Sequence, residues 1–163
     1  MLAIGLGLKS SNLDNLIKRM EDLEKQEAFV GVKPSQGVHS SGLNFTDLLW
    51  IHHMGVPSRN IPSRPISSIA KMTFKGHTVL RKSLDKYFSQ LDKKRAPVAA
   101  DKVLQPFAEE LWEYSWDIFG DTSYLENNAQ STIDRKGFDA PMFETGELRG
   151  QWSYYLNDKQ FKG

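Results

Sequence analysis

The chain has 163 residues, no cysteine, 25% charged and 11% aromatic residues, and a formal net charge of +1. This length and composition suit one folded domain (residues 1–163), while the small net charge predicts no bulk attraction to nucleic acid or membrane. The absence of cysteine excludes disulfide scaffolds, thiolate metal sites and cysteine nucleophiles. We expect no signal peptide and no membrane span, because the apolar N-terminus lacks a basic leader and no apolar run approaches about 20 residues.

The first third of the chain predicts a strand, a helix and a strand. Residues 2–8 alternate between apolar residues and small ones, which indicates a half-buried strand. Apolar residues then recur at helical spacing over residues 13–23, and residues 28–32 alternate as a second strand that stops at Pro34. Residues 35–43 have turn composition, so we expect a flexible surface loop there.

The middle of the chain predicts helices separated by a stiff loop. A short helix capped by Asn44 is expected to end at Gly55. Residues 51–66, which we call the anchor loop, contain three prolines that restrain the backbone. A helical stripe follows over residues 66–94, with a bend or break expected at Gly76. In the next helical pattern, Pro106 indicates either a kink or a start close by.

The last third is less regular. Residues 147–149 predict a short turn of helix, residues 152–156 predict a strand, and the polar tail at 158–163 is expected to fray. Together these elements predict an α+β fold with a small antiparallel sheet of about three to four strands. We expect this sheet to pack against several helices, one of them long.

The charges are distributed unevenly. Residues 59–95 hold ten basic residues against two acids, a balance of +8, whereas residues 96–126 hold one lysine against seven acids, a balance of −6. Segments of opposite charge usually pack on each other within a chain, which we favour. They can also pack between copies of the chain, which would promote self-assembly.

The ionisable residues indicate no catalytic residue, cofactor site or metal site. His52 and His53 are adjacent and therefore point about 100° apart on a helix, so they do not share a metal readily. His52 lies on the apolar face of its helix and is expected to be a hydrogen-bonded core residue. Lysines recurring over residues 71–95 favour a solvated face, with a nucleic-acid-binding module that uses this basic helix as the alternative function.

Two motifs resemble a family of tailed-bacteriophage neck proteins, the tail-completion or head–tail joining proteins. The first comprises residues 50–55 and 60–66, which overlap the anchor loop and are similar to the family's short helix ending in glycine and its Ile-Pro-x-Arg-Pro-Phe run into a long helix. The second comprises residues 128–137 and 141–149, similar to Thr-Ile-x-x-Lys-Gly and Pro-Leu-x-x-Thr-Gly-x-Leu. His53, Met54 and Ile66 depart from the usual pattern, and Gly163 leaves little room for the family's closing strand.

The resemblance implies a non-enzymatic virion protein of the phage neck or tail terminus, assembled in the bacterial cytoplasm. It implies a ring, six- or twelve-fold, that joins the head–tail junction and contacts connector or adaptor and tail terminator or tail-tube proteins. DNA in the channel is a further, non-specific contact, and no membrane is involved. The candidate interface residues are Arg59, Ile61, Arg64, Pro65, Lys71, Lys75 and Lys82, and the signature residues with structural roles are Gly55, Pro62, Gly137, Thr145, Gly146 and Leu148.

Arg64 has two alternative roles in the sequence. Its guanidinium carries five donors in a fixed fork suited to a carboxylate, and Pro65 keeps its backbone extended. One role is a surface cation or an intrachain salt bridge to the acidic segment, and the other is an intersubunit contact. Among the signature residues, Gly137 and Gly146 are expected to form tight turns, and Thr145 to bond nearby backbone amides.

Overall fold

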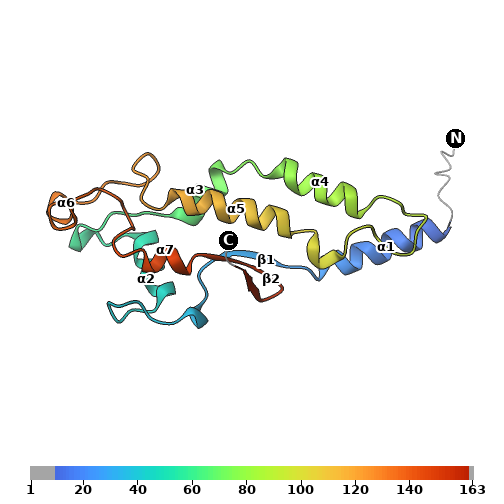
Figure 1. Cartoon of the computed structure of the whole chain (residues 1–163), viewed down its shortest axis with the longest axis horizontal. Coiled ribbons are helices and arrows are strands. Elements are labelled where there is room, and N and C mark those ends of the chain that lie inside the picture. Colours follow the sequence, from blue (N-terminus) through green and yellow to red (C-terminus); the bar gives the residue numbers. More distant parts are fainter. Residues whose placement is uncertain (1–9, 162–163) are drawn as a thin grey trace.

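The computed structural model describes residues 10–161, which fold into helices around a small sheet (Figure 1). The helices are α1 (Ser10–Glu24), α2 (Phe45–Met54), α3 (Ile66–Thr73), α4 (His77–Tyr87), α5 (Gln105–Ile118), α6 (Gln130–Lys136) and α7 (Glu147–Gln151). The strands are β1 (Ala28–Gly31), β2 (Ser153–Leu156) and β3 (Lys159–Phe161). The predicted α+β class with an antiparallel sheet is confirmed.

The sheet has the order β1-β2-β3, and both pairings are antiparallel. Ala28 pairs with Leu156 in the first pairing, and Tyr154 pairs with Phe161 in the second. The prediction that residues 158–163 fray is wrong for residues 159–161, which form β3 and pair with β2. Asn157 and Asp158 both take positive φ, as a two-residue hairpin turn of type I′ requires. The strand predicted over residues 2–8 lies outside the described residues.

Helix α5 lies at the centre of the molecule. It contacts β1 and β2 on one side and α3 and α4 on another, as the layers in Figure 1 show. The basic and acidic segments therefore pack on each other within the chain, as we favoured. However, no ion pair between residues 10 and 161 joins α3 or α4 to α5. The helices of the two segments therefore pack together without direct ion pairs between them.

The long helical stripe over residues 66–94 is broken, at the glycine where a bend or break was predicted. Helix α3 ends at Thr73 and α4 begins at His77. A Cβ atom on Gly76 would lie 2.2 Å from Phe74 Cε1, so the ring packs on the glycine. The expectation of one long helix is therefore wrong, and the helical part ends at Tyr87 rather than near residue 94.

The helix boundaries follow local signals elsewhere. Asn44 caps α2, and its side-chain oxygen accepts a bond from the Thr46 amide at 3.1 Å. Helix α5 begins at Gln105 with Pro106 in its first turn, so the helix starts there and is not kinked. Helix α6 was not predicted, because residues 124–137 show no clear period.

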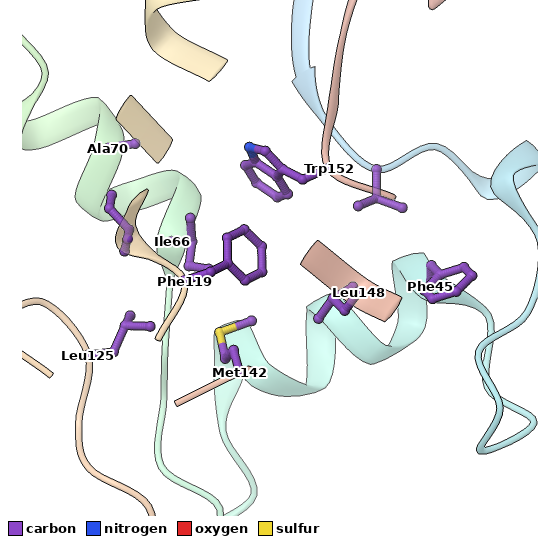
Figure 2. Close-up of a cluster of buried hydrophobic side chains, with 10 residues drawn as sticks. Phe45, Ile66, Ala70, Phe119, Leu125, Met142, Leu148 and Trp152 are labelled. Atoms are coloured by element: carbon purple, nitrogen blue, oxygen red, sulfur yellow. The ribbon is translucent and has the colours of Figure 1, made fainter. Parts of the chain in front are cut away.

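The main core brings both sequence motifs to one place (Figure 2). Ile66 comes from the end of the anchor loop, while Met142 and Leu148 come from the second motif, and all three are buried. They pack around Trp152, whose Nε1–H donates to Ser115 Oγ at 2.8 Å. Burying an indole with its donor satisfied makes this ring a fixed centre for the surrounding segments.

Candidate functional site

A groove of about 800 Å³ lies where the two motifs meet. Its walls come from α2, the anchor loop and residues 128–148, with the 39–43 loop at one side. Apolar side chains such as Ile51, Met142 and Phe143 line it together with charged ones. The basic lining residues are Arg59, Arg64, Arg135 and Lys136, and the acidic ones are Glu144 and Glu147. Four bases against two acids give the groove a net positive charge.

The tip of the anchor loop is held by a pair of backbone hydrogen bonds. The Val56 amide donates to Ile61 O at 2.8 Å, and the Ile61 amide donates to Val56 O at 3.1 Å. The 3₁₀ turn η2 (Pro57–Arg59) closes the tip, with Asn60 in the left-handed conformation. This small closed turn leaves Arg59 exposed at the wall of the groove, as a candidate interface residue requires.

Gly55 allows the anchor loop to fold back on α2. Its φ is +72°, and a Cβ atom there would lie 2.7 Å from the Ser63 amide nitrogen. Only glycine fits this close approach. The loop then returns along the end of α2, where the Arg64 amide donates to His52 O at 2.6 Å. Pro62, the other signature residue of this motif, lines the groove.

Arg64 joins the two motifs and has neither of the two predicted roles. Its side chain is buried, with Nε donating to Glu126 O at 2.9 Å and Nη2 donating to Asn127 O at 2.8 Å. Burial lowers the pKa of the guanidinium, an effect opposed by the charges of Glu126 and Asp139. Arg64 is therefore neither an exposed contact nor a salt bridge to the acidic helix; it fixes the start of the second motif.

The second motif is shaped by its glycines and by its own polar contacts. Gly137 and Gly146 both have a φ of +81°, which confirms the predicted tight turns. Thr145 Oγ1 accepts a bond from the Glu147 amide at 3.3 Å, as predicted. Arg135 and Glu144 form an ion pair, which lowers the pKa of the Glu144 carboxyl. Leu148 is buried in the core and anchors α7.

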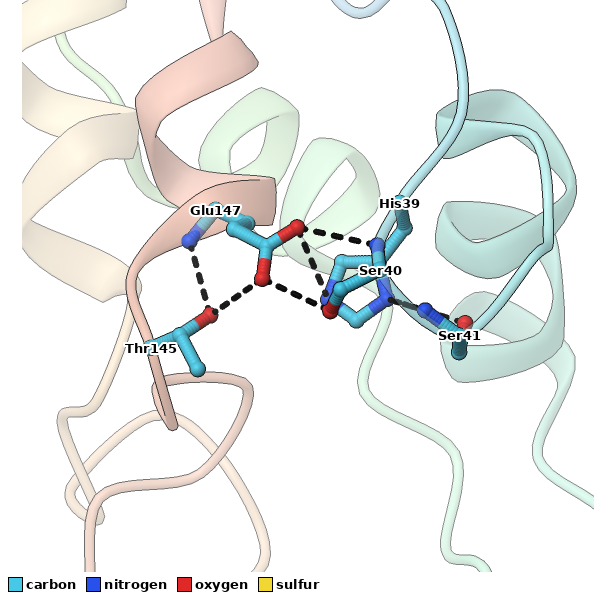
Figure 3. A network of polar contacts seen from close by, with 5 residues as sticks. All are labelled: His39, Ser40, Ser41, Thr145 and Glu147. Carbon is cyan, nitrogen blue, oxygen red and sulfur yellow. Dashed lines mark hydrogen bonds and ion pairs between the residues drawn. The ribbon is translucent and has the colours of Figure 1, made fainter.

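The 35–43 loop is tied to the second motif by Glu147 (Figure 3). The Ser40 amide donates to Glu147 Oε2 at 3.0 Å, and Ser40 Oγ donates to Oε1 at 2.7 Å. His39 Nε2 lies 3.9 Å from Oε2. The bonds from Ser40 lower the pKa of the Glu147 carboxyl. Sequence reasoning missed this network, because only the fold brings residues 107 positions apart together.

His52 lies in the groove as a neutral ring. Burial, with the nearby charges of Arg64 and His39, lowers its pKa from 6.5 to about 4. Its Nδ1 atom is buried and has no hydrogen-bond partner among the described residues, so the predicted hydrogen-bonded histidine is wrong for this atom. The neutral ring avoids a second positive charge beside Arg64.

The other candidate interface residues divide between two regions. Ile61 lines the groove, and Pro65 is half-buried before α3. Lys71 and Lys75 are exposed around the end of α3, and Lys82 is exposed on α4. Lys71 lines a separate apolar cavity between α3, α4 and α5. The seven predicted residues therefore do not form one surface.

Residues 10–161 contain neither a metal-binding cluster nor a membrane-spanning helix. No group of three or more His, Cys, Asp or Glu side chains is placed to hold a metal ion. In the same part of the chain, no helix has the length and apolar character needed to cross a membrane. Comparison with protein-family models, curated proteins and solved structures finds no match.

Proposed function

We propose that this chain is a structural, non-enzymatic virion protein of the neck or tail terminus of a tailed bacteriophage. It assembles in the host cytoplasm into a ring that joins or completes the tail at the head–tail junction. Its groove receives a segment of a neighbouring connector, adaptor, tail terminator or tail-tube protein.

One observation supports this proposal above the others. The two motifs that carry the resemblance are far apart in the sequence, yet they form the two walls of one groove. Arg64 links them, because its Nη2 donates to Asn128 Oδ1 of the second motif at 3.3 Å and its guanidinium also donates to the carbonyl groups of residues 126 and 127 just before that motif. An apolar lining with a net positive charge suits a partner segment that carries both apolar and acidic side chains.

Complementation of a phage that lacks the gene tests this function. We expect the wild-type protein to be found in purified particles and Arg59→Glu to lose infectious particles, because Arg59 is an exposed cation that lines the groove. Lys94→Glu is the matched control, since it makes the same charge change at an exposed site outside the groove. Absence of the wild-type protein from particles and tails contradicts the proposal.

A nucleic-acid-binding module remains the second candidate, and one observation favours it. Lys71, Lys75, Lys82 and Lys86 are all exposed, and none of the ion pairs within residues 10–161 engages them. Titration with duplex DNA at several salt concentrations tests it. Phosphate contacts produce a steep loss of affinity with salt, whereas negligible binding at low salt contradicts this function.

A further inference from the structure

The apolar stripe of α1 is covered on one side only. Leu16 and Leu23 are half-buried, on the same side as the buried Arg19. Leu13, Ile17 and Met20 lie on the adjoining side at helical spacing and remain 47%, 46% and 57% exposed. Isolated exposed apolar residues are ordinary, but three apolar residues on the same face of one helix form a continuous apolar surface. We call these three residues the α1 stripe.

Arg19 holds α1 in a fixed position. Its Nη1 donates to Tyr87 O at 2.9 Å and to Ser89 O at 2.5 Å, and Nη2 donates to three further carbonyls, those of Gln90, Lys93 and Arg95. Tyr87 Oη donates in return to Arg19 O at 3.0 Å. The helix therefore projects from one end of the molecule as a rigid arm (Figure 1). A rigid arm presents the stripe with little loss of conformational freedom on binding.

A matching apolar cavity lies elsewhere in the same chain. It has a volume of about 380 Å³ and lies between α3, α4 and α5, beside the break at Gly76. Phe74, Leu80, Phe107 and Leu111 are among its apolar lining residues. Cavities of this size accept large apolar side chains from a partner.

The charges on α1 and those on the α3 side of the cavity are opposite in sign. Helix α1 exposes Asp14, Glu21 and Glu24 against one exposed base, Lys18. Lys71 lines the cavity and is exposed, and Lys75 next to Phe74 is exposed as well. Opposite charges around an apolar contact favour one orientation of two surfaces and reject others.

We propose that the α1 stripe of one copy packs over the α3–α4–α5 cavity of a second copy. Figure 1 shows α1 beyond the far ends of α4 and α5, so the arm points away from the cavity of its own chain. The contact joins two different surfaces, and such head-to-tail contacts generate rings when the rotation closes. The inference rests on the proposed function for ring closure, while the contact between copies is testable without a phage.

Cysteine pairing tests the contact directly, because the natural chain has no cysteine. A full-length Met20→Cys protein is mixed with a full-length His77→Cys protein at high concentration and oxidised. Met54→Cys replaces Met20→Cys in the control, since both methionines are 57% exposed. We expect a mixed disulfide dimer with Met20→Cys and its loss with Met54→Cys. A chain carrying both Met20→Cys and His77→Cys should give a ladder of higher oligomers.

Two other occupants of the stripe would give different results. Symmetric pairing of two α1 helices predicts that Met20→Cys alone cross-links as fast as the mixture. Cover by residues 1–9 of the same chain predicts no mixed dimer, together with a larger loss of stability in Met20→Asp than in Met54→Asp. Either result overturns the proposal, as does a mixed dimer equal to that of the control.

The outcomes also separate this inference from the proposed function. A mixed dimer from a protein that is absent from phage particles keeps the contact and ends the neck assignment. A protein present in particles without this cross-link keeps the neck assignment, and its ring must then form through another surface.

Discussion

Two buried arginines, Arg19 and Arg64, hold separate segments of the chain together by donating hydrogen bonds to several backbone carbonyl groups. Each guanidinium donates to the backbone of an irregular segment, residues 87–95 for Arg19 and residues 126–127 for Arg64. Carbonyl groups outside regular secondary structure need donors when they leave water. The flat fork of arginine supplies several donors at once, which lysine cannot reproduce in the same geometry.

Replacing Arg64 tests this role at the groove. Arg64→Met should lower the free energy of unfolding by about 2–4 kcal/mol, because partly buried carbonyls lose charge-assisted bonds from a buried side chain. Arg59→Met is the control, since Arg59 is exposed, and should change stability by less than about 0.5 kcal/mol. Urea denaturation of both variants measures the difference. Equal stability of the two would show that Arg64 does not hold the second motif.

His52 predicts a dependence of stability on pH. Its pKa is lowered to about 4 in the folded protein, so protonation favours the unfolded chain. The folded state is therefore fully stable above the unfolded pKa of about 6.5 and loses stability as the pH falls toward about 4. The loss attributable to this ring amounts to about 2 kcal/mol by about pH 5.

His52→Asn should make the free energy of unfolding depend less on pH between about pH 7 and pH 5, as measured by denaturation at several pH values. The baseline stability of the variant is not the readout, because the slope with pH reports proton binding alone. His53→Asn is the matched control, since its ring stacks on Trp50 and does not line the groove. An unchanged slope in His52→Asn would contradict the argument.

At the scale of elements, two turn glycines differ in how closely their surroundings pack. Gly55 and Gly137 have similar positive φ values of +72° and +81°, but their surroundings differ. A Cβ atom at Gly55 would meet the Ser63 amide nitrogen at 2.7 Å, whereas one at Gly137 would meet nothing within 4 Å. Replacing each glycine by alanine therefore separates two losses of stability, one from the positive φ and one from the clash of the new Cβ atom with the backbone.

Gly137→Ala should destabilise the protein by about 1 kcal/mol, the cost of the left-handed conformation. Gly55→Ala should cost clearly more, about 2–4 kcal/mol, because the backbone of the anchor loop must also move. Thermal or urea unfolding of the pair provides the measurement. Similar losses in both variants would mean that the anchor loop does not approach α2 closely in solution.

At the scale of the whole molecule, the chain forms a central body with one projecting helix. The body is built on α5, the sheet and the core around Trp152, while α1 contacts η3 (Ala100–Lys102) and is tied to residues 87–95. An isolated helix of 15 residues is marginally stable in water. The position and order of α1 therefore depend on its tertiary contacts, of which Arg19 makes the most hydrogen bonds.

Arg19→Leu should weaken the attachment of α1 to residues 87–95. We expect the amide hydrogens of α1 to exchange at least tenfold faster, which corresponds to a fall of about 1.4 kcal/mol in the free energy of local opening. The amide hydrogens of α5 should stay protected. Lys18→Leu is the control, since Lys18 is the exposed neighbour of Arg19 on the same helix. Hydrogen-exchange mass spectrometry resolves the two helices. Unchanged exchange in α1 would show that other contacts hold the arm.

The sequence by itself determined the features that depend on neighbouring residues. The Asn44 cap, the break at Gly76, the start of α5 near Pro106 and the turns at Gly137 and Gly146 were predicted because each reflects local backbone geometry. The α+β class followed from the periods of the apolar residues. None of these signals depends on which distant segment lies alongside.

Only the tertiary structure decided which segments meet. Arg64 and its acceptors are more than 60 residues apart, and Ser40 and Glu147 are 107 apart, so no local pattern reports these contacts. The tail was too short and polar to predict β3, which exists because β2 offers it a partner edge. The apolar period of α1 predicted a buried face, but only packing showed which side is covered, because burial depends on the surfaces that the fold brings to each side chain.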